Sequence, residues 1–335
     1  MTRTTRSKLK PFVLAALVAL TGAFAAGCSD DNGEALKKTV LDSLNKQADM
    51  KSHSFSGTAD LNIGALPQSA DANPVASSLL SMFQNSKLEW NGAATTEPVR
   101  LEATVKSTQA GSANALELPL LLKDNKLYVN LPLINKKDEF FQIDLAQLSA
   151  MSGQNNALSA ESFKQATQTA SGIGSVLISD LKPKWFAEDK EPAAFQDGAK
   201  GTLIRIDITD KNKKEVTDAM RAKLPEMIDK LAAGGFVAKG QADKLKEDAK
   251  TISVETPGKL TFAIDEQGFA REQQIEIAYT QAGKDGLPVK RHLNLHLKAE
   301  GINKEPKFVK EVPTQVKPFE DVLRLLFGAG KAPQK

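Results

Sequence analysis

The 335-residue chain has a single cysteine, Cys28. No internal disulfide can form, so packing alone must stabilise the folded core. Histidine is almost as scarce, with only His53, His292 and His296, and the last two fall on one face of an expected strand about 13 Å apart. That separation is too large for one metal ion, so these histidines are expected to be solvated or hydrogen-bonded, and no metal site is predicted.

Signatures of catalysis are also missing. The pair Ser43 and Lys46 matches the Ser-x-x-Lys element of acyl enzymes, and Tyr128-Val-Asn130 matches a second element, but the third, Lys-Thr-Gly-like element is absent. Carboxylates occur singly at expected strand ends, so no general acid/base pair can be formed. We therefore predict no catalytic residue, no cofactor and no enzyme activity.

Clustered positive charge is confined to the N-terminus. Four of the 44 basic side chains lie within residues 1–27, where no acidic residue occurs, so 40 basic side chains remain against 41 acidic ones. Binding of nucleic acid needs a concentrated positive surface, and none is predicted in the rest of the chain. Tryptophan and tyrosine occur only twice each, which argues against a sugar-binding surface rich in aromatic side chains.

The N-terminus has the layout of an export signal. A basic start is followed by an apolar run from Pro11 to Gly27 that ends in small residues. The run is shorter than a membrane-spanning helix requires. Residues 24–28, Phe-Ala-Ala-Gly-Cys, resemble the bacterial lipobox, with Ala25 where that motif usually has leucine. The resemblance implies cleavage before Cys28 and a diacylglyceryl anchor of the palmitate type on its thiol. The alternatives are a buried free cysteine or a plain secreted protein.

The remaining chain divides by composition into three parts. Residues 28–33 are predicted to be a lipidated tether, residues 34–327 the folded body and residues 328–335 a flexible tail. The body is expected to be one unit or two meander halves, 34–197 and 198–327. An anchored body would face away from the cytoplasm, on the outer leaflet of the plasma membrane or, in a Gram-negative cell, on the outer membrane.

Periodicity predicts a helix over residues 34–51, followed by a long strand with one apolar face over residues 52–63. Short connections between strands predict antiparallel pairing. A helical insertion is expected over residues 213–249, divided at Pro225 and at Gly234-Gly235. Segment 64–85 is expected to be a helix or a flap, with Met82 and Phe83 at its tip. The other predicted strands are 87–95, 99–108, 115–122, 126–131, 139–145, 201–208, 259–265, 269–280 and 288–300, and a last helix is expected at 319–327.

This order of elements, together with the stretch Leu260-Thr-Phe-Ala-Ile-Asp-Glu-Gln-Gly-Phe-Ala-Arg-Glu, resembles the lipoprotein-carrier superfamily that includes LolA, LolB and the LppX type. The segment Lys123-Asp-Asn-Lys-Leu-Tyr-Val-Asn is similar to hairpins of Gram-positive lipoproteins. The resemblance covers roughly residues 34–310 and includes no binding signature. It implies an α+β fold in which a strongly curved antiparallel sheet, a half-barrel, wraps around or is covered by helices and encloses an apolar cavity for acyl chains.

The strands favour such a cavity independently, because each has one apolar face that must be covered. Space left unfilled there would bind lipid, since each buried CH2 group contributes ~0.8 kcal/mol. The same pattern also fits an ordinary filled core. The candidate lining residues are Phe55, Leu61, Ile63, Leu101, Val105, Leu127, Val129, Phe141, Ile143, Ile206, Phe262, Ile264, Ile275, Ile277, Leu293, Leu295 and Leu297.

The expected function is that of a membrane-anchored, non-enzymatic carrier or sensor for a lipid or an acylated molecule. The alternative is a structural or interaction lipoprotein of the cell envelope, with a filled core and a protein partner. A cavity above ~300 Å³ would favour the carrier. A core packed without voids would favour the alternative.

Overall fold

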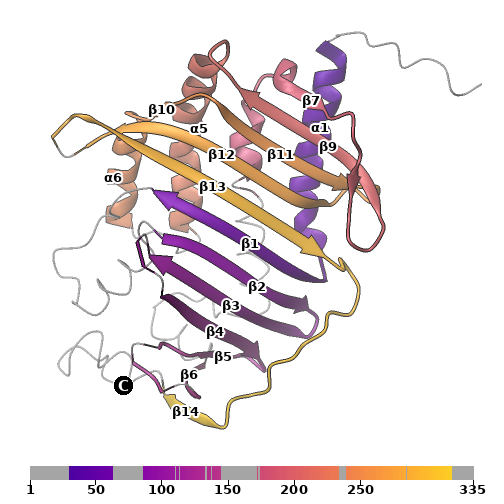
Figure 1. Cartoon of the computed structure of the whole chain (residues 1–335), viewed down its shortest axis with the longest axis vertical. Coiled ribbons are helices and arrows are strands. Elements are labelled where there is room, and N and C mark those ends of the chain that lie inside the picture. The colour runs from indigo at the N-terminus through magenta and orange to yellow at the C-terminus, as the bar shows by residue number, and fades with distance from the viewer. Residues whose placement is uncertain are drawn as a thin grey trace, which may run out of the picture.

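A computed structural model describes residues 30–62, 86–109, 111–112, 114–132, 134–136, 138–144, 172, 174–233, 239–283 and 285–318. Within these ranges the strands form one large, curved sheet of 14 strands that does not close into a barrel (Figure 1). Its main order is β14-β6-β5-β4-β3-β2-β1-β13-β12-β11-β9-β7, with β10 beside β12 and β8 beside β9. The fold is therefore α+β, with one sheet shared by the whole described body.

Several predictions concern residues outside the described ranges. They are the export signal, the lipidation of Cys28, the flap candidates Met82 and Phe83, the lining candidate Ile63 and the helix at 319–327. Leu61 belongs to a described strand by its backbone alone. These predictions stay untested.

The first half of the sheet follows the alternating sequence closely, because every predicted strand between residues 52 and 145 is present. The strands are β1 (Ser52–Asn62), β2 (Ser86–Thr96), β3 (Val99–Gln109), β4 (Ala115–Lys123), β5 (Lys126–Val129) and β6 (Glu139–Asp144). Asp124 and Asn125 have φ angles of 52° and 57° between β4 and β5. Two left-handed residues form the two-residue turn that matches the twist of antiparallel strands.

The second half adds helices and longer strands. Its elements are the 3-10 turn η2 (Pro183–Trp185), β7 (Phe186–Glu188), β8 (Ala193–Ala194), β9 (Lys200–Ile208), α5 (Lys213–Ala233), α6 (Lys239–Ala249), β10 (Ser253–Val254), β11 (Gly258–Asp265), β12 (Ala270–Ala282), β13 (Pro288–Glu300) and β14 (Gln315–Pro318). Strand β13 pairs with β1 from Ser54↔Glu300 to Asn62↔His292, so the two meanders join along one long edge.

The N-terminal helix begins earlier than the sequence predicts. Helix α1 (Asp30–Lys46) is followed by the 3-10 turn η1 (Gln47–Asp49), so residues 30–33 of the predicted tether are helical. Gly33 packs so closely on η2 that a Cβ atom there would lie 2.4 Å from the carbonyl oxygen of Pro183. The helix therefore continues to a point two residues from Cys28.

One prediction is wrong and another holds only in part. Helix α5 passes through Pro225, which was expected to divide the insertion. Proline weakens a helix by removing one backbone N–H bond. The next turn of helix α5 is stabilised by Ile228, which is buried with Ala242 and Ala249 of α6. Strand β14 pairs in parallel with β6, so the sheet is mixed at this edge and not wholly antiparallel.

The main hydrophobic core lies between helices and the second half of the sheet. Leu36, Val40 and Leu44 of α1 pack with Val216 of α5 and with the apolar side chains of β9, β11 and β12, including Ile206, Phe262 and Ile277. We call the face of the sheet that carries this core the inner face, and the opposite face the outer face. In Figure 1 the described helices lie against β9–β13, and none lies behind β2–β6.

Candidate functional site

Directly paired residues show that the inner face is apolar along most of the sheet. One row of partners runs Phe262, Gln273, Leu297, Gly57, Trp90, Val105, Leu118, and the next runs Ala299, Phe55, Gly92, Ala103, Leu120, Val129, Phe141. Residues directly opposite on neighbouring strands share a face. The predicted lining residues with described side chains therefore all lie on the inner face.

These residues fall into two groups. Ile206, Phe262, Ile264 and Ile277 belong to the filled core under the helices, and Ile275 packs against it. Phe141 and Ile143 are buried at the other end of the sheet but do not belong to that cluster. The half-buried group lies on β1, β3, β5 and β13 and comprises Phe55, Leu101, Val105, Leu127, Val129, Leu293, Leu295 and Leu297.

A pocket of about 230 Å³ lies at the boundary between the helix-covered strands and the rest of the inner face. We call it the seam pocket. Its apolar wall includes Met50, Phe55, Trp90, Leu297 and Ala299. Its polar residues are Gln47, His53, Ser56, Arg271, Gln273 and Lys298, and Ala270 completes the lining. The pocket is smaller than the ~300 Å³ typical of ligand sites, and it lies at one end of the apolar rows.

Two aromatic–glycine pairs shape the wall of the seam pocket. Phe55 is the direct partner of Gly92, and Trp90 is the direct partner of Gly57. A Cβ atom at Gly57 would lie 2.4 Å from the Trp90 ring, and one at Gly92 would lie 2.6 Å from the tip of the Phe55 ring. Each glycine thus leaves the space that the aromatic ring of the neighbouring strand occupies.

His53 is the only described histidine without a hydrogen bond. Its Nδ1 atom is buried and has no partner, while its ring lies 5.8 Å from the Phe55 ring, centre to centre. Burial lowers the pKa of His53 below its ordinary value, because the charged form loses hydration. At neutral pH the side chain is therefore uncharged.

Arg271 stands between the seam pocket and the turns at the end of the sheet. Its side chain is 5% exposed, and Nη1 donates to both carboxylate oxygens of Asp197 at 2.9 and 3.2 Å. The guanidinium also lies 4.4 Å from the Phe195 ring. Its charge is paired with Asp197, which also lies 3.5 Å from Lys304, so the guanidinium already has a carboxylate partner before any ligand binds.

The Arg271–Asp197 pair predicts a loss of stability in acid. The hydrogen bond from Arg271 lowers the pKa of Asp197 to about 2, from an ordinary value of 3.8. A carboxyl with a depressed folded pKa stabilises the fold above its unfolded pKa and loses that contribution as pH falls through the folded value. The melting temperature of Asp197→Asn should therefore be lower than that of the unmodified protein at pH 7, with the difference closing between pH 4 and 2. A difference as large at pH 2 as at pH 7 would contradict this assignment, and Glu191→Gln serves as the exposed control.

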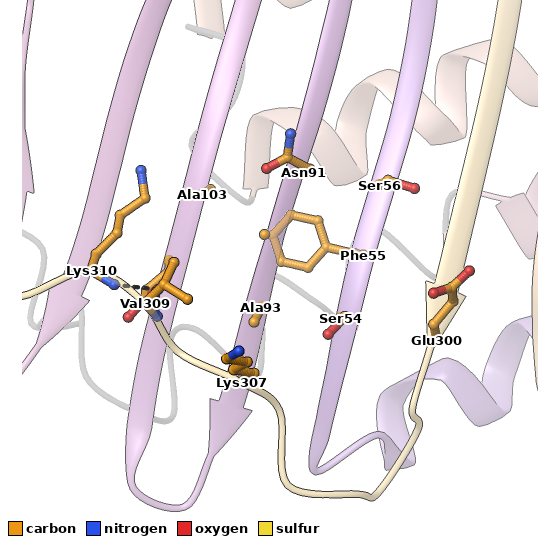
Figure 2. A pocket seen from close by; sticks show the side chains of 12 residues that line it. Ser54, Phe55, Ser56, Asn91, Ala93, Ala103, Glu300, Lys307, Val309 and Lys310 are labelled. Carbon is orange, nitrogen blue, oxygen red and sulfur yellow. Dashed lines mark hydrogen bonds between the residues drawn. The ribbon is translucent and has the colours of Figure 1, made fainter. Parts of the chain in front are cut away.

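A second cavity of about 310 Å³ lies on the outer face, beneath residues 305–313, which we call the strap. Figure 2 shows Lys307, Val309 and Lys310 on the strap, with Glu300 at the end of β13. Sheet residues in its lining include Ser54, Ser56, Asn91 and Ala93. This groove has both apolar and polar lining residues and carries both charge signs, from Glu300 and from Lys307 and Lys310.

The strap is held by a buried carboxylate. Glu102 is 3% exposed and accepts the backbone N–H groups of Val309 and Lys310 at 2.8 and 2.9 Å. Its other oxygen accepts a hydrogen bond from Arg100 at 2.6 Å, and Arg100 lies over the Phe308 ring. Burial alone would raise the pKa of Glu102, but these hydrogen bonds outweigh it and lower the pKa.

The acyl-enzyme motif does not form a site. Ser43 is 1% exposed and donates to the carbonyl of Val40 at 2.8 Å. Lys46 bonds the carbonyl of Gln267 and lies over the Phe269 ring. Ser43 is therefore engaged within α1, and Lys46 joins α1 to the β11–β12 turn.

The outer-face histidines are each hydrogen-bonded to a carboxylate. Nε2 of His292 lies 3.1 Å from Asp60, and Nε2 of His296 lies 2.5 Å from Glu272. The described residues contain no group of three or more His, Cys, Asp or Glu side chains placed to hold a metal ion. None of the described helices has the length and apolar composition needed to cross a bilayer.

The two aromatic–glycine pairs and the buried Nδ1 atom of His53 cannot be predicted from the alternation alone. Trp90 alternates in step with Leu88, and His53 alternates in step with Phe55. The sequence pattern therefore places both side chains on the apolar face. The missing information was the register of β1 with β2, which decides the residue that lies opposite each ring.

No family model matches the sequence, and no curated protein matches it. Among solved structures, the crystal structure of LprF from Mycobacterium bovis is similar with a TM-score of 0.32 and 8% sequence identity, over 83% of this chain and 97% of LprF. At this TM-score the similarity carries no inference about the chain.

Proposed function

We propose that the chain is an exported lipoprotein, anchored through a diacylglyceryl group on Cys28, that binds or carries a lipid or another acylated molecule on the inner face of its sheet. In this proposal it has no catalytic role and needs no cofactor. Because α1 begins two residues after Cys28, the body would stand close to the membrane that supplies the ligand.

The observation that carries the proposal is the continuation of the apolar inner face beyond the described helices. Through β1–β6 this face bears Trp90, Leu101, Val105, Leu120 and Val129, all half-buried. An acyl chain laid along these rows from the seam pocket would gain about 0.8 kcal/mol for each CH2 removed from water. The helix-covered part is already filled by side chains, which directs the ligand to β1–β6.

Bound lipid is the first expected result. Native mass spectrometry of the exported protein, purified without detergent, should show an added mass that organic extraction removes and identifies as an acyl compound. A ligand-free protein that also takes up no fatty-acid probe would rule out the carrier.

The two tryptophans allow the binding place to be tested. Trp185→Phe leaves Trp90, in the seam pocket, as the only tryptophan, and Trp90→Phe leaves Trp185, which packs on the filled core. A brominated acyl chain quenches tryptophan only at short range. We expect saturable quenching of roughly half or more of the Trp90 emission and little quenching of Trp185. Equal quenching of both would place the ligand elsewhere.

One observation favours the alternative of an interaction lipoprotein. Val309, Val312 and Val316 are exposed within one eight-residue stretch that includes the end of the strap and the edge strand β14, and exposed apolar side chains occur at protein contacts. This alternative predicts that Val309→Ser and Val316→Ser weaken an envelope complex detected by crosslinking in cells. It would also leave Trp90 unquenched.

A further inference from the structure

The polar side of the seam pocket includes uncharged groups from three elements. Gln47 comes from η1, His53 from β1 and Gln273 from β12. The side-chain nitrogen of Gln47 donates a hydrogen bond to the carbonyl of Ala270 at 2.9 Å, so the side-chain oxygen of Gln47 points away from that carbonyl. The opposite side is formed by Phe55, Trp90 and Leu297, so the pocket has a polar end and an apolar wall, as an amphiphile requires.

The charged residues in the lining are already neutralised. Arg271 is paired with Asp197 through both carboxylate oxygens, and Lys298 lies 3.6 Å from Glu272. His53 is neutral at physiological pH because burial lowers its pKa. A carboxylate or phosphate entering this pocket would lose water without gaining an unpaired cation, which disfavours its binding.

The buried Nδ1 atom of His53 indicates what the pocket would accept. A buried polar nitrogen without a partner destabilises the free protein, and a ligand group that pairs with it removes that cost. Nδ1 is a donor in one imidazole tautomer and an acceptor in the other. A hydroxyl group can donate or accept, so it fits either tautomer, whereas an ester or carboxylate oxygen only accepts.

We propose that the seam pocket binds an uncharged, hydroxyl-bearing head group, that of a partial acylglycerol, with its hydroxyl on His53 and its acyl chain along the inner face of β1 and β2. This inference rests on the proposed function and specifies its ligand. The neutral lining selects against fatty acids and phospholipids, and the unpaired histidine nitrogen selects for the hydroxyl.

Three ligands with the same 9,10-dibromostearoyl chain separate the effect of ligand charge from the effect of the hydroxyl group. They are the monoacylglycerol, the free acid and the methyl ester, titrated at pH 8.5 into the Trp185→Phe protein with Trp90 emission as the readout. We expect the monoacylglycerol to bind about tenfold more tightly than the methyl ester, as one hydrogen bond in a buried site allows. The ionised acid should bind more weakly than the ester. If a glycoside with the same chain binds as tightly as the acylglycerol, the hydroxyl group that pairs with His53 is that of a sugar.

His53→Phe in the same background should abolish the preference for the acylglycerol and leave affinity for the methyl ester within twofold. His292→Phe, on the outer face, is the matched control and should keep the preference. If the acid binds best, or if His53→Phe weakens all ligands equally, the head-group inference is overturned while lipid binding stands. If no ligand quenches Trp90, the proposed function fails and the inference fails with it.

Discussion

Replacing Gly92 by alanine is expected to destabilise the fold by about 3 kcal/mol, because the new Cβ atom would clash with the backbone of the neighbouring strand. It would lie 2.1 Å from the carbonyl oxygen of Glu102 and 2.6 Å from the tip of the Phe55 ring. Rotating Phe55 away relieves only the second contact, and the first requires β3 to move. Urea denaturation followed by circular dichroism measures the loss.

The control for Gly92→Ala is Gly174→Ala. A Cβ atom at Gly174 would lie 3.6 Å from Leu44, an ordinary contact, and residues 174–179 are helical, so alanine should be neutral or stabilising there. A Gly92→Ala protein as stable as the unmodified one would show that β2 and β3 are not packed at this distance. The same variant should displace Phe55 and so reduce quenching of Trp90 by the brominated ligand.

Replacing Glu102 by alanine is expected to destabilise the protein by about 3–5 kcal/mol, since one partner of a buried charged pair is removed. Arg100 would lose its carboxylate, and the backbone N–H groups of Val309 and Lys310 would lose their acceptor. The strap should separate from β3. Limited digestion with trypsin, followed by mass spectrometry, should then detect cleavage after Lys307 and Lys310 before any other site.

Glu117→Ala provides the comparison for Glu102. Glu117 is an exposed carboxylate on the neighbouring strand β4, so its removal changes the net charge equally without uncovering a buried group. Equal protection of the strap in both variants would mean that the carboxylate of Glu102 does not hold it. Lipid binding at Trp90 should be unchanged in Glu117→Ala, because Glu117 lies on the outer face.

The long strands could be predicted from the sequence because their alternation is strong. Leu203-Ile204-Arg205-Ile206-Asp207-Ile208 alternates along β9, and Ile204, Ile206 and Ile208 are each no more than 1% exposed. Period-two alternation reports which face is buried whatever the neighbouring strand is. For this reason the candidate residues with described side chains fall on one face, although nothing in the alternation separates a filled core from a cavity.

The short strands could not be predicted by the same means. Strands β8 and β10 have two residues each, and β14 has four, which is too short for a period to be visible. They exist because longer neighbours, β9, β12 and β6, offer free backbone groups. The pairing of β1 with β13 cannot be predicted from the sequence either. Both strands alternate clearly, and this alternation would fit any antiparallel neighbour.

The site shows the same limit at the level of single residues. In the sequence His53 is an ordinary polar residue at the start of a strand, and only the structure places it in a pocket with residues of η1, β12 and β13. Arg271 lies in the predicted Phe269–Thr280 strand, yet its charge is neutralised by Asp197 in a distant turn. Electrostatics of this kind depends on tertiary contacts, so the sequence predicts an apolar surface but not the charge of its ligand.

The position of β1 beside β13 also decides when the protein can finish folding. A chain that emerges N-terminus first makes β1 early, whereas its partner appears only once residues 292–300 have followed. Until then one edge of β1 presents unpaired N–H and C=O groups, and such an edge is a template for association with other chains. Helix α1 also cannot bury its apolar side until later in synthesis, because it packs on strands of the second half of the sheet. The protein is therefore vulnerable to aggregation until β13 has been made, and any product truncated before Pro288 would keep open edges at both β1 and β12.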